Sequence, residues 1–178
     1  MGMKNDALIF AGIGILIVIA LSSFTGSGGG DFDFSSLVAT YGADNVNRLT
    51  NLYQAMQGKG LSDLQTRLML SQALHETGLF TASPNYNLMD NNNNFAGITK
   101  NSRYPNSPNA YADYPDLNTF VNDWVYVLGL NNQPINATGP DDFVTRLQAN
   151  GYFTDSYATY DNAVNSYYNL LNQTITTS

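Results

Sequence analysis

The sequence predicts an α+β fold that is mainly helical, with a small β lobe, preceded by one N-terminal transmembrane helix. Three observations support this prediction. The stretch from Ser62 to Phe80 has the start signal and apolar body of a buried helix, an uncharged apolar segment runs from Ala7 to Phe24, and an Asn- and Pro-rich region separates two groups of helical patterns. The predicted domains are a membrane anchor over 1–24, a Gly/Ser-rich linker over 25–36 and a globular domain over 37–178.

The composition excludes several classes of function. Charged residues make up only 12% of the 178 residues, and the formal net charge is −7. The chain has no basic stripe of the kind that phosphate contacts require, so no nucleic-acid partner is expected. Cysteine is absent, which excludes a disulfide framework. The single histidine, His75, excludes a multi-histidine metal site, and we expect neither a metal nor a cofactor.

The N-terminal segment is long enough to cross a lipid membrane once. From Ala7 to Phe24, at about 1.5 Å per residue, it spans roughly 27 Å, close to the roughly 30 Å of a hydrocarbon core. Lys4 precedes it and no Lys or Arg follows until Arg48. The positive-inside rule therefore predicts a cytoplasmic N-terminus and a globular domain on the periplasmic or cell-wall side. The alternative is a cleaved signal peptide, with Ala20 and Ser22 near the cut.

A linker and one helix are expected before the central helix. Thr25 to Gly30 reads TGSGGG, which is typical of a flexible linker. Phe32 and Phe34 follow, and they either pack on the domain or lie at the membrane interface. A helix is predicted from Asp44 to Gln57, because apolar residues recur at spacings of three and four: Val46, Leu49, Tyr53 and Met56.

The stretch from Ser62 to Phe80 predicts a central helix that carries an acidic residue at its end. Ser62 and Gln65 form a capping-box pattern, so the helix begins near Asp63. Its apolar residues leave no wide polar face, which is typical of a helix buried on most sides, and Gly78 can end it. Glu76 falls in the last turn, where the macrodipole and burial both disfavour a carboxylate. Partial burial raises a carboxyl pKa towards that of a general acid; the alternative is a glutamate that points into water.

The second half of the chain combines loops with three further helices. The Asn run at 91–94 suits turns, Phe95 to Thr99 suits a short strand, and 101–115 suits an irregular or hairpin-bearing lobe. The predicted helices cover 117–128, introduced by Pro115 and Asp116, a short segment capped by Asp141 or Asp142 and ended by Asn150-Gly151, and 157–172. Trp124 lies on an apolar helix face and is expected in the core.

Four segments carry a resemblance to a known family. They are QALHETG (72–78), NNNNFAGIT (91–99), AYADYPDLNTFVNDW (110–124) and GYFTDSYATY (151–160). In this order they resemble the glucosaminidase-type peptidoglycan hydrolases of the lysozyme superfamily, similar forms of which occur in autolysins, flagellar muramidases and phage virion lysins. The resemblance covers 44–171 and implies a lysozyme-like domain, with peptidoglycan glycan strands as the partner.

The resemblance also implies roles for individual residues. It makes Glu76 the general acid, and it places a groove tyrosine at Tyr160 or Tyr157, since the expected position falls on Ala158. We prefer Tyr160, which requires a small insertion. The floor of the sugar groove falls on Asn93, Asn94, Phe95, Gly97 and Ile98. Tyrosines expected to stack on sugar faces are Tyr104, Tyr111, Tyr114 and Tyr152.

A second catalytic carboxylate cannot be a glutamate, because Glu76 is the only one in the chain. The aspartates available are Asp90, Asp113 and Asp116. Each also has an ordinary structural interpretation, as a turn residue, a solvated residue and a helix cap. If none of them acts, the 2-acetamido group or the C6 hydroxyl of the sugar takes over the missing role.

The leading hypothesis is a glycosidase that cuts the β-1,4 glycan of the cell wall from a membrane anchor, either as an N-acetylglucosaminidase or as a muramidase. A phage virion lysin, with other virion proteins as partners and a virion membrane as its location, is one form of this hypothesis. The first alternative is a lytic transglycosylase with a single catalytic Glu. The second is an inactive structural or wall-binding membrane protein on the same fold.

Overall fold

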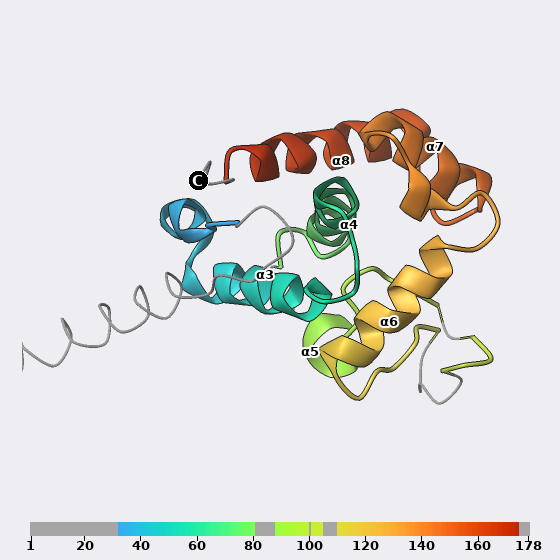
Figure 1. Ribbon diagram of the computed structural model, residues 1–178, viewed down its shortest axis with the longest axis horizontal. Helices are drawn as coiled ribbons and strands as arrows, with labels where there is room; N and C mark the ends of the chain where they lie inside the picture. The colour runs from blue at the N-terminus through green and yellow to red at the C-terminus, as the bar shows by residue number, and fades with distance from the viewer. Residues whose placement is uncertain (1–31, 81–87, 100, 105–109, 175–178) are drawn as a thin grey trace, which may run out of the picture.

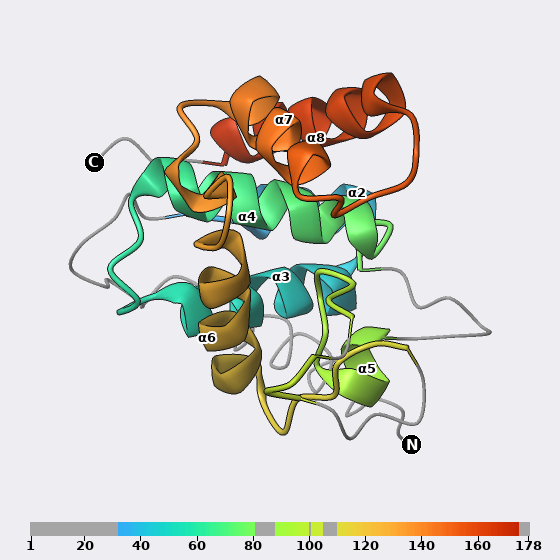
Figure 2. The same ribbon diagram turned by 90° about the vertical axis from the view of Figure 1, so that its right-hand side faces the viewer.

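The domain is a set of helices arranged around one buried helix, α4 (Asp63–Glu76), in the computed structural model, which describes residues 32–80, 88–99, 101–104 and 110–174. In Figure 2, α7 (Pro140–Ala149) and α8 (Tyr157–Asn172) lie on one side of α4, and α3 (Ala43–Met56) and α6 (Leu117–Leu128) lie on the other. The shorter elements are η1 (Ser35–Leu37), α2 (Val38–Tyr41), α5 (Leu88–Asn92) and η2 (Pro134–Asn136).

The central helix begins and ends as its sequence predicts. Ser62 Oγ accepts a hydrogen bond from the Gln65 backbone N–H at 3.3 Å, and the Gln65 side chain accepts one from the Ser62 N–H at 2.8 Å, which completes the capping box. After the helix, Gly78 adopts φ +56°. The N–H of Gly78 bonds the carbonyl of His75 at 3.2 Å, and the N–H of Leu79 bonds that of Leu74 at 2.8 Å. This is a Schellman motif, which ends α4 directly after Glu76.

Burial of α4 fixes the position of its last residue. Every side chain from Leu68 to Leu74 is buried, and α4 lies near the centre of the molecule in Figure 1. Burying a leucine or methionine side chain, four of which lie in this range, stabilises the fold by about 1.5–3 kcal/mol each. The body of the helix is therefore held rigidly between α3 and α8, and the C-terminal end of α4 projects Glu76 at a defined place on the surface.

The other predicted helices are confirmed, with one change in capping. Asp116 caps α6 by accepting a hydrogen bond from the Thr119 N–H at 2.7 Å. The prediction that Asp141 or Asp142 caps α7 is wrong, because Pro140 starts that helix and Gly139 is its N-cap. Asp142 instead lies within the first turn and accepts a hydrogen bond from the Thr138 N–H at 2.9 Å.

Packed structure begins before the predicted boundary at residue 37. Phe34 is 3% exposed, and the rings of Phe32 and Phe34 lie 5.1 and 5.7 Å from that of Tyr53 on α3. The first alternative for these two phenylalanines is therefore the one observed. The proposed anchor, Ala7 to Phe24, and the glycine-rich part of the linker lie outside the described residues, and no helix in the described ranges is long and apolar enough to cross a membrane.

The mainly helical class is confirmed, and the described part of the predicted β lobe contains no strand. In the described part of 95–115, strand pairing is limited to a single bridge between Thr99 and Tyr111. The buried side chain of Asn94 holds this part of the chain together, because its Nδ2 donates to the carbonyls of Ile98 at 2.8 Å and Ala112 at 3.1 Å. The Ile98 carbonyl also accepts the backbone N–H of Ala112 at 2.8 Å, and the segment predicted as a strand, Phe95 to Thr99, is a tight loop beside the single bridge.

Candidate active site

A cleft of roughly 390 Å³ opens at the C-terminal end of α4. Volumes of this order are typical of small-molecule sites. Five segments supply its walls: the end of α4, the start of α5, the loop at 97–99, Tyr111 and the segment that leads into α8. Its lining residues are His75, Glu76, Leu88, Gly97, Thr99, Tyr111, Tyr152, Phe153, Thr154, Asp155 and Tyr160.

Glu76 is the carboxylate at the end of α4, and its side chain is exposed to the solvent of the cleft. Its Oε1 accepts a hydrogen bond from the Tyr160 hydroxyl at 2.7 Å. Protein groups that surround the carboxyl desolvate it and raise the pKa of Glu76, an effect that the hydrogen bond from Tyr160 partly opposes. A carboxyl with a raised pKa keeps its proton to a higher pH than an ordinary glutamate, as a general acid must.

Tyr160 is held rigidly beside Glu76. Its ring stacks on Phe153 with 3.9 Å between centroids, and His75 meets its edge at 4.5 Å. Burial, followed by the charge of Glu76, raises the pKa of the Tyr160 hydroxyl far above its ordinary value. The hydroxyl therefore stays protonated at every working pH and remains available as a hydrogen-bond donor to Glu76.

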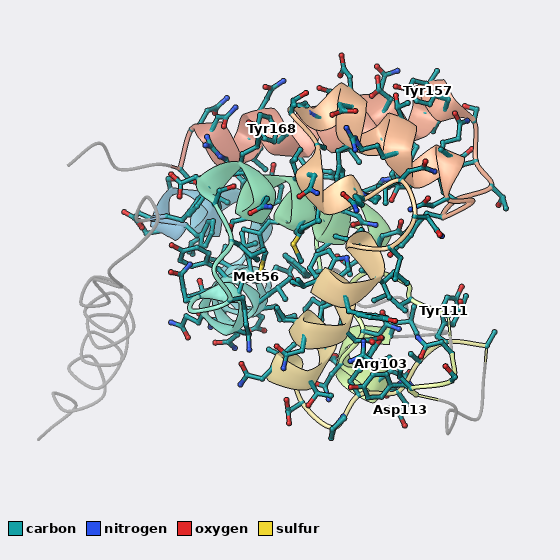
Figure 3. All side chains as sticks on the ribbon, turned by 45° about the vertical axis from the view of Figure 1, so that its right-hand side comes forward. Met56, Arg103, Tyr111, Asp113, Tyr157 and Tyr168 are labelled. Carbon is teal, nitrogen blue, oxygen red and sulfur yellow. The ribbon has the colours of Figure 1, made fainter. Side chains whose placement is uncertain are left out.

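Tyr157, the other candidate for this position, points away from the cleft. Its hydroxyl lies 3.1 Å from Thr145 Oγ1 and 3.4 Å from the carbonyl of Asp141, both on α7. In Figure 3 it lies on α8 far from Tyr111, which belongs to the opposite wall. Of the two tyrosines, the structure brings only Tyr160 to Glu76.

Gly97 forms the wall directly opposite the carboxyl of Glu76. It adopts φ +62°, and a Cβ added to it would lie 3.3 Å from Glu76 Oε2. Backbone in this left-handed region favours glycine, because a side chain there costs about 1–2 kcal/mol. The absence of a side chain at this position also leaves the second carboxyl oxygen free to face the cleft.

We expect Gly97→Ala to lower both stability and activity. The φ angle alone should reduce the free energy of unfolding by about 1–2 kcal/mol, and the added methyl should displace the Glu76 carboxyl and lower the rate severalfold. Gly60→Ala is the matched control, since Gly60 adopts φ +72° with no atom within 4 Å of an added Cβ. Thermal unfolding and cell-wall digestion of both variants test this. Equal activities of the two would show that the space at Gly97 is not needed.

Of the predicted floor residues, Gly97 lines the cleft, whereas Asn93, Asn94 and Phe95 support it from inside and are not among the lining residues. Asn93 Nδ2 donates to the carbonyl of Tyr114 at 2.8 Å, while Asn94 is fully buried and spans the loop around Gly97. Phe95 is 5% exposed, with its ring 5.6 Å from Phe80. The prediction that Asn93, Asn94 and Phe95 contact the sugar is therefore corrected. These three residues support the loop that contains Gly97.

Two of the four tyrosines expected to stack on sugars line the cleft, Tyr111 and Tyr152. Tyr114 does not, because it is 2% exposed and its hydroxyl donates to the buried Asp123 at 2.9 Å. Tyr104 packs on Tyr114 with 4.7 Å between ring centroids and is not among the lining residues. The prediction for Tyr114 is therefore corrected to packing of the lobe, that for Tyr104 stays a prediction, and Trp124 is buried as expected.

The three aspartates proposed as a second carboxylate all lie elsewhere. Asp90 pairs with Arg48 at 2.9 Å, Asp116 caps α6, and Asp113 is exposed in the loop before α6. The second acid that lines the cleft is Asp155. The described parts of the chain contain no group of three or more acidic, histidine or cysteine side chains placed to hold a metal.

Several residues that line the cleft were not predicted from the sequence, among them His75, Phe153 and Asp155. Asp155 and Phe153 lie in the segment GYFTDSYATY, whose resemblance to the family was noted, and His75 directly precedes Glu76. The signal for Asp155 was therefore present, because a motif residue close to the groove tyrosine is a reasonable candidate for the groove. No sequence signal identifies the packing of Phe153 on Tyr160, which depends on the turn before α8.

Taken together, the cleft offers one carboxyl with a raised pKa, a phenol fixed as its donor and one further acid. This set suits transfer of a proton to a leaving oxygen, as in glycoside cleavage. The described residues that line the cleft include no Lys or Arg, which makes this part of it poorly suited to phosphate esters.

The comparisons with known proteins agree with this chemistry. The model of the glucosaminidase family, described as mannosyl-glycoprotein endo-β-N-acetylglucosaminidase, matches residues 52–176. No curated protein and no solved structure matches the chain. The matched region contains every residue that lines the cleft, and it confirms the resemblance inferred from the four segments. The chain therefore belongs to the glucosaminidase family and is a glycoside hydrolase that acts on peptidoglycan.

Proposed function

We propose that the protein is an endo-acting N-acetylglucosaminidase that cuts the β-1,4 glycan of peptidoglycan, with Glu76 as the general acid. The observation that carries this proposal is the 2.7 Å hydrogen bond between Tyr160 and Glu76 within a cleft that raises the pKa of the carboxyl. Glu76 donates its proton to the glycosidic oxygen as the bond from that oxygen to C1 breaks. The Tyr160 hydroxyl then stabilises the carboxylate that remains.

The positive charge that develops at C1 needs a partner on the other face of the sugar. The 2-acetamido group of the sugar can supply it, because its carbonyl oxygen can bond C1 to give a cyclic intermediate. Water then opens this ring, and the Glu76 carboxylate takes the proton that water releases. Asp155 lines the same cleft and is the side chain available to accept a hydrogen bond from the acetamido N–H.

The choice of N-acetylglucosaminidase over muramidase rests on the description of the matching family. The family description names the bond after N-acetylglucosamine.

Analysis of the products tests this proposal. Purified peptidoglycan is digested with the protein, reduced with borohydride and examined by mass spectrometry. We expect reduced N-acetylglucosamine ends. Reduced N-acetylmuramic acid would indicate a muramidase, and 1,6-anhydro ends would indicate a lytic transglycosylase. No release of fragments by folded protein would support the inactive, wall-binding alternative.

We also propose that Ala7 to Phe24 anchors the protein in a membrane, with the N-terminus in the cytoplasm and the catalytic domain on the wall side. The support is the uncharged length of this segment and the placement of Lys4 before it. A virion membrane is one setting for the same topology. Alkaline extraction of membranes tests the anchor, since an integral protein should stay in the pellet, and protease added to the outside should cut the domain. Release by alkali would contradict it.

A further inference from the structure

We propose that Gln72 is a positioning residue that sets the direction of the hydrogen bonds around Glu76 from inside the core. Its carboxamide is held by Trp124 so that its NH₂ group faces the hydroxyl oxygens of Tyr160 and Tyr152. The hydroxyl proton of Tyr160 is then donated to Glu76, and that of Tyr152 to the carbonyl of Ala96. This inference rests on the proposed role of Glu76 as a general acid.

The first support is where Gln72 lies. It is four residues before Glu76, so the two side chains share one face of α4. It is fully buried, and its Oε1 accepts a hydrogen bond from Trp124 Nε1 at 3.3 Å. An indole N–H can only donate, so Trp124 must face the carbonyl oxygen of the carboxamide. The orientation of Gln72 is thereby fixed, with its NH₂ group turned away from Trp124.

The second support is what the NH₂ group meets. Nε2 is buried and has no partner in ordinary hydrogen-bond geometry, so it needs an acceptor nearby. The side chain lies close enough to the hydroxyls of Tyr152 and Tyr160 to lower the pKa of each, against the larger effect of burial. A phenol oxygen can accept a hydrogen bond from an amide N–H, so these two oxygens are the acceptors that we assign to Nε2.

The consequence is a fixed direction for both hydroxyl protons. With its oxygen facing the Gln72 amide, Tyr160 donates to Glu76 Oε1 at 2.7 Å, and Tyr152 donates to the carbonyl of Ala96, beside Gly97. One buried carboxamide thus orients both the donor to Glu76 and the donor to the loop that contains Gly97. Hydrogen bonds in such a chain strengthen one another, so loss of the bond from Gln72 to Tyr160 weakens the bond from Tyr160 to Glu76.

Replacement of Gln72 should therefore change the titration of Glu76. Without the amide, Tyr160 is a weaker and less directed donor, so the Glu76 carboxylate loses stabilisation and its pKa rises further. The titratable groups that line the cleft with Glu76 are His75 on α4, Tyr111, and Tyr152, Asp155 and Tyr160 around the start of α8. The proposal predicts that Gln72→Met moves the basic limb of the rate profile to higher pH, while kcat falls roughly two- to tenfold, as for one hydrogen bond.

The chain offers a direct readout of this effect. Glu76 is the only glutamate, so the full-length protein labelled with ¹³C at the glutamate carboxyl gives a single side-chain resonance of this residue type. Its titration in Gln72→Met should have a higher midpoint than in the wild type. This measurement needs no activity, so an inactive wild-type protein would overturn the proposed function while still testing the role of Gln72.

Ser71→Ala is the matched control. Ser71 is the preceding residue of α4, is fully buried and donates to the Leu68 carbonyl at 2.8 Å. It should lose stability without any shift of the Glu76 midpoint. If Gln72→Met does not fold, Trp124→Phe removes the group that orients the carboxamide and should shift the midpoint in the same direction. In a Tyr160→Phe background, neither change should shift it further. An unchanged midpoint in folded Gln72→Met, or a shift equal to that of Ser71→Ala, would overturn the proposal.

Discussion

Replacing Glu76 with Gln is expected to lower the rate of cell-wall digestion by about 10² to 10⁴, the range that a positioned general acid usually contributes. The glutamine keeps the shape of the side chain, and its carbonyl oxygen can still accept the hydrogen bond from Tyr160. The one property lost is a proton that can be donated. The rate is measured as clearance of purified walls with equal amounts of folded protein.

The same substitution should leave stability unchanged or raise it by about 0.3–1 kcal/mol, because a carboxylate in the last turn of α4 opposes the helix macrodipole. The dependence on pH follows from the raised pKa of Glu76. Above the ordinary glutamate pKa and up to the raised one, the native state binds more protons than the unfolded chain. The wild type therefore loses stability as the pH rises through this window, and Glu76→Gln does not share that loss. An active but destabilised variant would contradict the role of Glu76.

Tyr160→Phe is expected to lower turnover by more than tenfold, the second largest effect of a single substitution. Phenylalanine keeps the stacking on Phe153 and the contact with His75, so the melting temperature should change little. What is lost is the O–H that stabilises the Glu76 carboxylate after it gives up its proton, at 2.7 Å in the wild type. The pKa of Glu76 should rise as a result, because the hydrogen bond from Tyr160 lowers that pKa in the wild type.

Tyr157→Phe is the control for this substitution, because the Tyr157 hydroxyl contacts α7 and not the cleft. It should keep the activity of the wild type. Both variants are measured by initial rates of wall digestion and by thermal unfolding. Full activity of Tyr160→Phe would mean that Glu76 does not need the hydrogen bond from Tyr160. A loss of activity in Tyr157→Phe alone would mean that Tyr157, and not Tyr160, assists Glu76.

Local signals account for what the sequence could predict. The capping box at Ser62 and Gln65 and the glycine at 78 determine where α4 begins and ends, and both depend only on neighbours along the chain. Because these limits were correct, Glu76 could be placed at the end of a buried helix without knowledge of the fold. The resemblance then added Tyr160, which lies 84 residues away in the chain.

The parts that could not be predicted depend on side chains that meet from distant segments. In the described part of the expected β lobe, the Asn94 side chain, predicted to lie in the sugar groove, is buried and bonds the carbonyls of Ile98 and Ala112. Tyr114 was expected in the cleft but is buried against Asp123, a contact that periodicity cannot reveal. Asp155 shows the opposite error, since it lay within a quoted motif while three other aspartates were considered in its place.

The most direct test of the role of Glu76 compares two titrations of the wild-type protein. The first follows the ¹³C carboxyl resonance of Glu76, the single glutamate. The second follows kcat/KM for wall digestion, whose basic limb reports the essential acid of the free enzyme. If Glu76 is the general acid, the two midpoints coincide and lie above the ordinary glutamate pKa, as desolvation in the cleft predicts. Full activity at a pH where the resonance shows Glu76 to be ionised would contradict the account.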